Sequence, residues 1–382
     1  VCVLLLVVAP NALLAADAST STNQEEGLSA DYLGGMGYSI NTEESNPMNM
    51  IWDTYSGISK DGALVTWFLD SSSAADRGGF VSVTSDSGQG ASAASNIILA
   101  NGSEGAYAAM ALRLIIADGT ERYSDQINAA GLSDLASIIN DPAACRDTVL
   151  KNPDLYPGVS GSLSEENAVY MRASLYIAET LTETEVIAFY NGICSERGDG
   201  GIAYVALNAG MIPLYYGDGS SISTLAYLND YSSDTYGAST KYFSYGYSDV
   251  TYTDAMYESF LWKALFGVTG ESAGVTQSIA YELVYSDGTV TAQPGLGLSG
   301  FEVEYWQVKY NPDGDASLTD GGWVYMDGYE AIELQKTNGG LINYFSSIVL
   351  LKVSDPADET AVTGQITYNG GTPLPGAKVA VF

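Results

Sequence analysis

The chain contains no histidine, and this absence removes several kinds of catalytic site at once. Histidine is the most frequent general base near neutral pH, a common zinc ligand and the central residue of the Ser-His-Asp triad. Any chemistry in this protein must therefore use carboxylates, hydroxyl groups, lysine or tyrosine.

Cysteine is also scarce. The three cysteines, Cys2, Cys145 and Cys194, are odd in number and far apart, so they predict neither a disulfide framework nor a metal site. A disulfide between Cys145 and Cys194 is one alternative. Two small buried thiols are the simpler one.

Basic residues are few, because only 14 Lys and Arg stand against 46 Asp and Glu, for a formal net charge of -32. A field of this sign repels phosphate backbones and anionic lipid surfaces, so we expect no nucleic-acid partner. The acids are spread along the whole chain, which favours a solvated outer surface, in a salty medium, over one acidic binding site. Together with 28 tyrosines and 42 glycines, this composition indicates an extracytoplasmic protein with many loops.

The two ends of the sequence are apolar. The first residues read VCVLLLVVAPNALLAA, which is shorter than the roughly 20 residues that cross a bilayer. Residues 1–18 are therefore either the end of a transmembrane helix or the remnant of a signal peptide without its basic segment. The other end stops inside an apolar strand pattern at Phe382, so we expect the chain to be a piece of a longer protein.

Between these ends the patterns alternate between strand and helix. GALVTWFL is a short apolar run typical of a strand, and the Ala, Met, Leu and Ile spacing that follows predicts a helix over about 103–117. Two consecutive helices are predicted next, the first capped by Ser164 and the second by a capping box of Thr182 with Glu185. GIAYVALNAGMIPLYY then reads as a buried strand, and DAMYESFLWKALFG as one amphipathic helix ending at Gly267.

The last part of the chain changes to β-type runs, which include SSIVLLKVSD and AVTGQITYNGGTPLPGAKVAVF. We therefore predict a mixed α/β globular domain, rich in helix with a central sheet, over 19–353. The end of a transmembrane helix precedes it. The start of a truncated all-β module, of the Ig-like or sandwich type, follows over 354–382, since about 30 residues are too few for a core of their own.

The order of these segments resembles the soluble C-terminal region of the archaeal oligosaccharyltransferase catalytic subunit. In that family, a last transmembrane helix leads to a helix and then to a strand that ends in a Trp-Trp-Asp-Tyr-Gly motif, followed by a loop and a long helix. The corresponding segments here are VLLLVVAPNALLAA, NPMNMIWDTYSG, ALVTWFLDSS and RGGFVSVTSDSGQGASAASNIILANGSEGAYAAMALRL. Later agreements are NAVYMRASLYIAETLTETEVIAFY, AYVALNAGMIP, MYESFLWKALFG and the β-type tail.

The resemblance assigns an acceptor-binding role to Trp67, Phe68 and Asp70. Trp67 matches the first Trp of the motif, Phe68 replaces the second, and Asp70 matches the Asp if Leu69 is an insertion. Ser71 and the residue after it stand in place of Tyr and Gly. In the family this motif binds the Ser or Thr hydroxyl of the Asn-x-Ser/Thr acceptor. On the residues alone, a strand end with two core aromatics and an Asp in a turn is the simpler interpretation, and the order of the family-like segments favours the pocket.

The resemblance also implies partners and a cofactor. The partners would be an acceptor polypeptide with Asn-x-Ser/Thr and a lipid-linked oligosaccharide, with attachment to the membrane through upstream helices and this domain on the extracytoplasmic face. The catalytic and metal-binding carboxylates of the family lie in loops between those upstream helices. A divalent metal, Mn or Mg, would therefore be bound outside this chain, which by itself should be inactive and contain no catalytic or metal-ligating residue.

A second hypothesis is a secreted or cell-surface structural or binding protein of an archaeal envelope. It explains the acidity and the tyrosine and glycine content, and it requires that the first residues belong to a signal peptide. Further hydrophobic spans upstream of Val1 would favour the transferase, whereas a short basic segment after an initiator Met would favour the secreted protein.

One modification motif stands apart from these hypotheses. Asn101-Gly102-Ser103 is a formal N-glycosylation acceptor, and a helix N-cap at Ser103 explains the same residues equally well.

Overall fold

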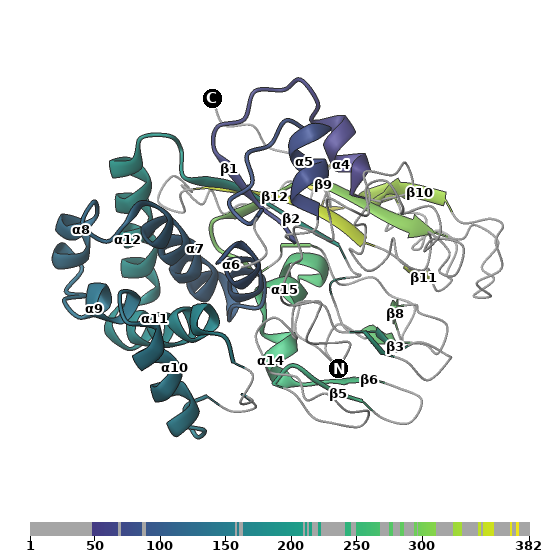
Figure 1. The fold of residues 1–382 in the computed structure, drawn as a ribbon. Coiled ribbons are helices and arrows are strands. Elements are labelled where there is room, and N and C mark those ends of the chain that lie inside the picture. The colour runs from purple at the N-terminus through teal and green to yellow at the C-terminus, as the bar shows by residue number, and fades with distance from the viewer. Residues whose placement is uncertain are drawn as a thin grey trace, which may run out of the picture.

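The computed structural model describes residues 48–67, 70–85, 89–156, 159, 163–208, 211, 214–215, 221–222, 241–245, 250–267, 275–277, 283–285, 294–295, 297–310, 324–330, 343–344, 347–354, 367–368 and 372–373. These residues form a mixed α/β fold in which helices flank a central sheet (Figure 1). Phe68, Leu69, the N-terminal 47 residues and most of the proposed β-module lie outside the described residues. Among the described residues, no helix is both long and apolar enough to cross a membrane.

The central sheet has five strands in the order β1-β2-β12-β9-β10. Their bounds are β1 Ala63–Val65, β2 Ile202–Asn208, β12 Ser347–Val353, β9 Phe301–Tyr310 and β10 Val324–Asp327. β1 is parallel to β2, with Val65 opposite Val205, and every other pair in this sheet is antiparallel. β1 confirms the first part of the strand expected at GALVTWFL, β2 confirms the one expected at GIAYVALN, and every residue of β2 is buried. A strand buried on both faces reads as a continuous apolar run, which is why it was recognisable.

A separate hydrophobic core lies on each face of the sheet. On one face, Leu64, Tyr204 and Leu350 pack with residues of α4 (Asn49–Thr54) and α5 (Ser71–Asp76). On the other face, Val205 and Val349 pack with a larger helical layer. That layer includes α6 Gln89–Ile98, α7 Gly102–Asp118, α8 Ser124–Ala129, α9 Leu135–Ile139, α10 Pro142–Lys151, α11 Glu165–Thr180, α12 Glu183–Arg197, α14 Asp254–Tyr257 and α15 Phe260–Phe266. Figure 1 shows α4 and α5 above the sheet and this larger layer on its other side.

Local capping signals set several helix ends as predicted. Ser164 accepts a hydrogen bond from the N–H of Asn167 at the start of α11. Thr182 and Glu185 form the capping box of α12. α7 extends one residue beyond the predicted range at each end, and Gly267 ends α15 in the left-handed conformation.

Two expectations about helices were wrong. The predicted single helix over 254–267 is two short helices, because the buried Ser259 hydroxyl donates to the carbonyl of Met256 and caps the N–H of Trp262, which starts a new helix. The resemblance implies a loop for the Ser, Gly and Ala tract after Trp67. Its described parts contain α5 and α6, whose buried faces are built mainly from Ala and Ser.

The remaining described strands form small pairings outside the central sheet. They are β3 Leu214–Tyr215 with β4 Ser221–Ile222, β5 Phe243–Tyr245 with β6 Val250–Tyr252, the sheet of β11 Asn343–Tyr344, β8 Leu283–Tyr285 and β7 Val275–Gln277, and β13 Thr367–Tyr368 with β14 Thr372–Pro373. Only β13 and β14 fall in the predicted C-terminal module, and they make one hairpin pairing. The described residues therefore do not define an Ig-like module.

Candidate functional site

The candidate site lies where β1 ends. Because β1 and β2 are parallel, their carboxyl ends share one edge of the sheet, and in open α/β folds ligands bind beyond that edge. Trp67 follows β1, and Asp70 follows as the residue that caps α5. The backbone N–H of Asp70 donates to the carbonyl of Trp67 at 2.9 Å, which turns the chain from the strand into the helix.

Both described motif residues are buried. The exposed fraction is 3% for Trp67 and 0% for Asp70. Trp67 belongs to the larger core, together with Val65 and residues of α6 and α7. The side chain of Asp70 makes no capping bond to α5, so its carboxylate is not used to start that helix. Asp is rarely buried completely, so a fully buried carboxylate at this position is unusual for a simple turn.

A chain of hydroxyl groups closes this end of β1. The hydroxyl oxygens of Ser71 and Ser82 are 2.9 Å apart, and those of Ser82 and Thr84 are 3.1 Å apart. Thr84 donates to the carbonyl of Thr66 at 2.7 Å, and Thr66 donates to the carbonyl of Ala206 at 3.1 Å. The chain therefore links the start of α5 to the end of β2 through side chains that donate and accept hydrogen bonds without carrying charge.

The hydroxyl residues and Asn208 were not recognised in the sequence as part of the site. Asn208 is fully buried and ends β2, where an isolated polar residue after six buried ones was the available signal. Ser82 and Thr84 reach the site because the segment after α5 returns along β1. The N–H of Leu64 donates to Val81 at 2.8 Å, and the carbonyl of Leu64 accepts from Val83 at 3.0 Å. No local pattern indicates this return.

Of the three predicted acceptor-binding residues, the structure thus places Trp67 and Asp70 at the same end of β1, while Phe68 lies outside the described residues. A separate cleft of about 250 Å³ is lined by residues that include Asn96, Asn101, Met171, Leu175, Lys241 and Tyr242. Neither Trp67 nor Asp70 lines it, so this cleft is not the candidate site.

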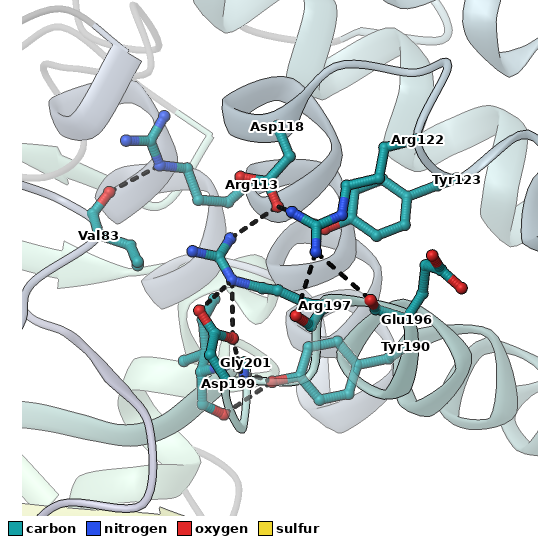
Figure 2. Close-up of polar contacts among 11 residues, drawn as sticks. Val83, Arg113, Asp118, Arg122, Tyr123, Tyr190, Glu196, Arg197, Asp199 and Gly201 are labelled. Atoms are coloured by element: carbon teal, nitrogen blue, oxygen red, sulfur yellow. Dashed lines mark hydrogen bonds and ion pairs between the residues drawn. The ribbon is translucent and has the colours of Figure 1, made fainter.

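A second polar cluster lies at the opposite edge of the two parallel strands, before β2 begins (Figure 2). Asp118, at the end of α7, accepts from the hydroxyl of Tyr123 at 2.5 Å and from Arg197 at 3.1 Å. Arg197 also binds both carboxylate oxygens of Asp199, at 2.8 and 2.7 Å, and Asp199 accepts from the N–H of Gly201 at 3.1 Å. These contacts connect the ends of α7 and α12 to the start of β2.

The electrostatics of this second cluster suit a structural role. Burial, followed by the hydrogen bond to Asp118, raises the pKa of Tyr123. Burial also raises the pKa of Tyr190, whose hydroxyl donates to the carbonyl of Ile202 at 2.7 Å. Although burial opposes the effect, hydrogen bonds from Arg197 and Gly201 hold the pKa of Asp199 below its ordinary value. Both phenols therefore stay protonated as hydrogen-bond donors at neutral pH.

Arg113 links α7 to the segment after α5. Its Nε donates to the carbonyl of Val83 at 2.6 Å, as Figure 2 shows, so α7 holds the segment that carries Ser82 and Thr84.

Clusters of metal-ligating residues and reactive thiols were the remaining features to consider in the described parts of the chain. They contain no group of three or more Cys, Asp or Glu placed to hold a metal ion. Cys145 and Cys194 are both free thiols, and of the two only Cys145 is buried as the simpler alternative predicted. Burial raises the pKa of each thiol, which lowers its reactivity.

Comparisons with models of protein families, with curated proteins and with solved structures found no match to this chain. The functional argument therefore depends on the residues and their geometry.

Proposed function

We propose that this chain is the C-terminal extracytoplasmic part of a membrane oligosaccharyltransferase and that it recognises the Ser or Thr of Asn-x-Ser/Thr acceptors. The observation that carries the proposal is Asp70, a fully buried carboxylate three residues after the buried Trp67, where the chain leaves the carboxyl edge of two parallel strands. The order of the sequence segments supports the resemblance to the family. The position of Asp70 and Trp67 supports the binding of a hydroxyl group.

A buried carboxylate is well suited to recognise a hydroxyl group. The acceptor hydroxyl donates to the carboxylate, the indole N–H donates to the hydroxyl oxygen, and the aromatic face excludes water. A peptide that lacks the hydroxyl leaves these buried polar groups unpaired, which makes the site selective. Uncharged hydroxyl groups nearby, such as those of Thr66 and Ser71, keep the surroundings polar without an added charge.

Trp67 and Asp70 are both buried by surrounding residues. The end of β1 must therefore rearrange when a peptide binds. The hydrogen bonds that close this end are made by neutral hydroxyl groups, to each other or to backbone carbonyls, and each contributes about 0.5–1.5 kcal/mol. In the proposal, binding energy from the rest of the peptide replaces a few of them.

In this proposal the chain positions the acceptor peptide and takes no part in proton transfer. Divalent metal and the carboxylates that orient the lipid-linked donor belong to the membrane part of the full-length protein, upstream of this chain. Fixing the acceptor by its hydroxyl residue brings the Asn amide to a defined place relative to that donor, which lowers the entropic part of the barrier. The domain lies on the extracytoplasmic face, and the isolated chain does not transfer sugar.

The test is peptide binding to the full-length protein, reconstituted in a membrane with lipid-linked donor and Mn²⁺. Fluorescent Asn-x-Thr and Asn-x-Ala peptides are compared on wild type, Asp70→Asn and Trp67→Phe. The first substitution preserves the shape of the side chain, and the second keeps an aromatic ring but removes the indole N–H. We expect wild type to bind the Thr peptide about tenfold or more tightly than the Ala peptide, because a buried partner is otherwise left unpaired. Both substitutions should reduce this ratio towards one.

Trp52→Phe is the matched control, since Trp52 is an equally buried tryptophan in the core on the other face of the sheet. It should leave the ratio between the two peptides unchanged. Equal ratios in wild type and Asp70→Asn, with a change only in thermal stability, would show that Trp67 and Asp70 are core and turn residues.

A further inference from the structure

We propose that Asn101 is the attachment site of an N-linked glycan on this protein. Asn101-Gly102-Ser103 is the one Asn-x-Ser/Thr triplet in the 382 residues. Such a triplet marks a surface position in proteins that meet a glycosylation machinery. The proposal depends on the extracytoplasmic location proposed above, and it concerns a site separate from Trp67 and Asp70.

The structure presents the side chain of Asn101 to solvent from a fixed backbone. Asn101 is exposed, and it caps α7 without a side-chain hydrogen bond to the helix. Its backbone forms an antiparallel bridge to Ser259, and the N–H of Gly102 donates to the carbonyl of Glu258 at 3.0 Å. The amide of Asn101 is therefore not used to start α7, and the exposed side chain, which lines the cleft described above, is accessible from solvent.

Ser103 is the second informative residue. It is not the N-cap that the sequence allowed, because it is the second residue of α7 and only 6% exposed. Its hydroxyl is buried without a hydrogen-bond partner among the described residues. A buried unpaired hydroxyl lowers stability, and alanine would occupy this position without that penalty. The Ser103 hydroxyl therefore lowers the stability of the fold, and the same hydroxyl is the group that an Asn-x-Ser acceptor requires.

The modification is a glycosyl transfer with a defined balance. A bond forms between Nδ2 of Asn101 and the anomeric carbon of the glycan, while the bond from that carbon to the phosphate oxygen of a lipid carrier breaks. The carrier phosphate leaves with the electron pair, and the amide loses one proton to a carboxylate of the transferase. Because the folded chain buries Ser103, the transfer takes place before α7 forms.

The experiment is mass spectrometry of intact glycopeptides from the full-length protein, purified from the cells that produce it. We expect a glycan mass on the peptide that contains Asn101 and its complete loss in both Asn101→Gln and Ser103→Ala. Ser103→Ala should unfold at the same temperature as wild type or higher, so that loss of the glycan is not a consequence of misfolding. A deamidated peptide, which Asn-Gly pairs form spontaneously, does not count as modified.

Ala130→Thr provides a matched control, because it places a threonine two residues after the exposed Asn128 and so creates a second acceptor. A glycan on Asn128 of this variant together with an unmodified Asn101 would overturn the present inference and leave the proposed location intact. Absence of glycan from both positions would overturn the inference together with the proposed location.

Discussion

Arg197 is the residue on which the structural polar cluster depends. It contacts Asp118 and Asp199, and its side chain is 20% exposed while that of Asp118 is 16% exposed. Arg197→Gln removes both ion pairs and leaves the half-buried Asp118 with fewer donors. We expect a loss of about 1–2 kcal/mol in the free energy of unfolding, below the value for a fully buried pair because water still screens Asp199. Urea unfolding at pH 7 measures it.

The same substitution should change the response to acid. The folded-state pKa of Asp199 lies below its ordinary value of 3.8, so the contribution of this carboxylate is complete above that value and is lost as the pH falls through the folded value. The stability difference between wild type and Arg197→Gln should therefore be constant from pH 7 to pH 5 and shrink below about pH 4. A difference that persists unchanged in acid would mean that lost packing, and not charge, causes the effect.

Lys151→Gln is the control for this residue-scale prediction. Lys151 pairs with Asp147 one helical turn away, but the two side chains are 72% and 65% exposed. Exposed ion pairs of this kind contribute little, so the substitution should leave the urea midpoint unchanged within error.

At the scale of elements, Ser259 separates α14 from α15. Its hydroxyl accepts from the N–H of Trp262 at 3.2 Å and donates to the carbonyl of Met256 at 2.6 Å, and the residue is fully buried. Ser259→Ala removes the cap and leaves two buried backbone groups with one partner fewer. We expect the free energy of unfolding to fall by about 1–2 kcal/mol.

The measurement is chemical unfolding followed by circular dichroism, with Ser137→Ala as the comparison. Ser137 makes an exposed hydrogen bond to the carbonyl of Asp134, which water can replace, so this control should change stability little. If Ser259→Ala is as stable as wild type, the break between the two helices has another cause, and the single helix expected from the sequence would be an accessible alternative.

Which elements could be predicted depends on how local their causes are. The starts of α11 and α12 were predictable because Ser164 and the pair Thr182 with Glu185 act within three residues along the chain. α6 was missed because its buried residues are mostly Ala, Ser and Gly, and a tract rich in Ser and Gly is typical of a loop. The position of β12 between β2 and β9 has no local signal, since it pairs residues such as Leu351 and Val205 that are far apart in sequence.

In the candidate site, too, only the features with local causes could be predicted from the sequence. The sequence could indicate that Trp67 and Asp70 follow a buried strand, since a short apolar run and its end are local features. It could not indicate that Ser82 and Thr84 return to close that end, because this depends on pairing of the segment after α5 with Leu64. Nor could it indicate that both motif residues are covered, because burial depends on the packing of α6 and α7 against β1.

At the scale of the whole molecule, the excess of negative charge is the dominant feature. The 46 acidic residues outnumber the 14 basic ones, and several of the described basic groups, such as Arg77, Arg197 and Lys263, already pair with carboxylates. The folded chain holds the remaining acids closer together than the unfolded chain does. Their mutual repulsion therefore destabilises the folded state at low ionic strength.

Salt should relieve this repulsion. The screening length falls from about 10 Å at 0.1 M salt to about 3 Å at 1 M, which is shorter than most distances between surface charges. We expect the urea midpoint of unfolding to rise steadily with NaCl over this range, and KCl to act equally. Sucrose, which is excluded from the surface but carries no charge, separates screening from a general effect of added solute.

A variant with fewer acids tests whether charge is the cause. Glu121→Gln, Asp154→Asn and Glu179→Gln replace three exposed carboxylates, two in turns and one on α11, and together they remove three negative charges. The triple variant should be more stable than wild type at low salt and equal to it at 1 M, so the slope of stability against salt becomes smaller. Equal slopes in the two proteins would attribute the effect to stronger apolar burial in salt, because that contribution is independent of net charge.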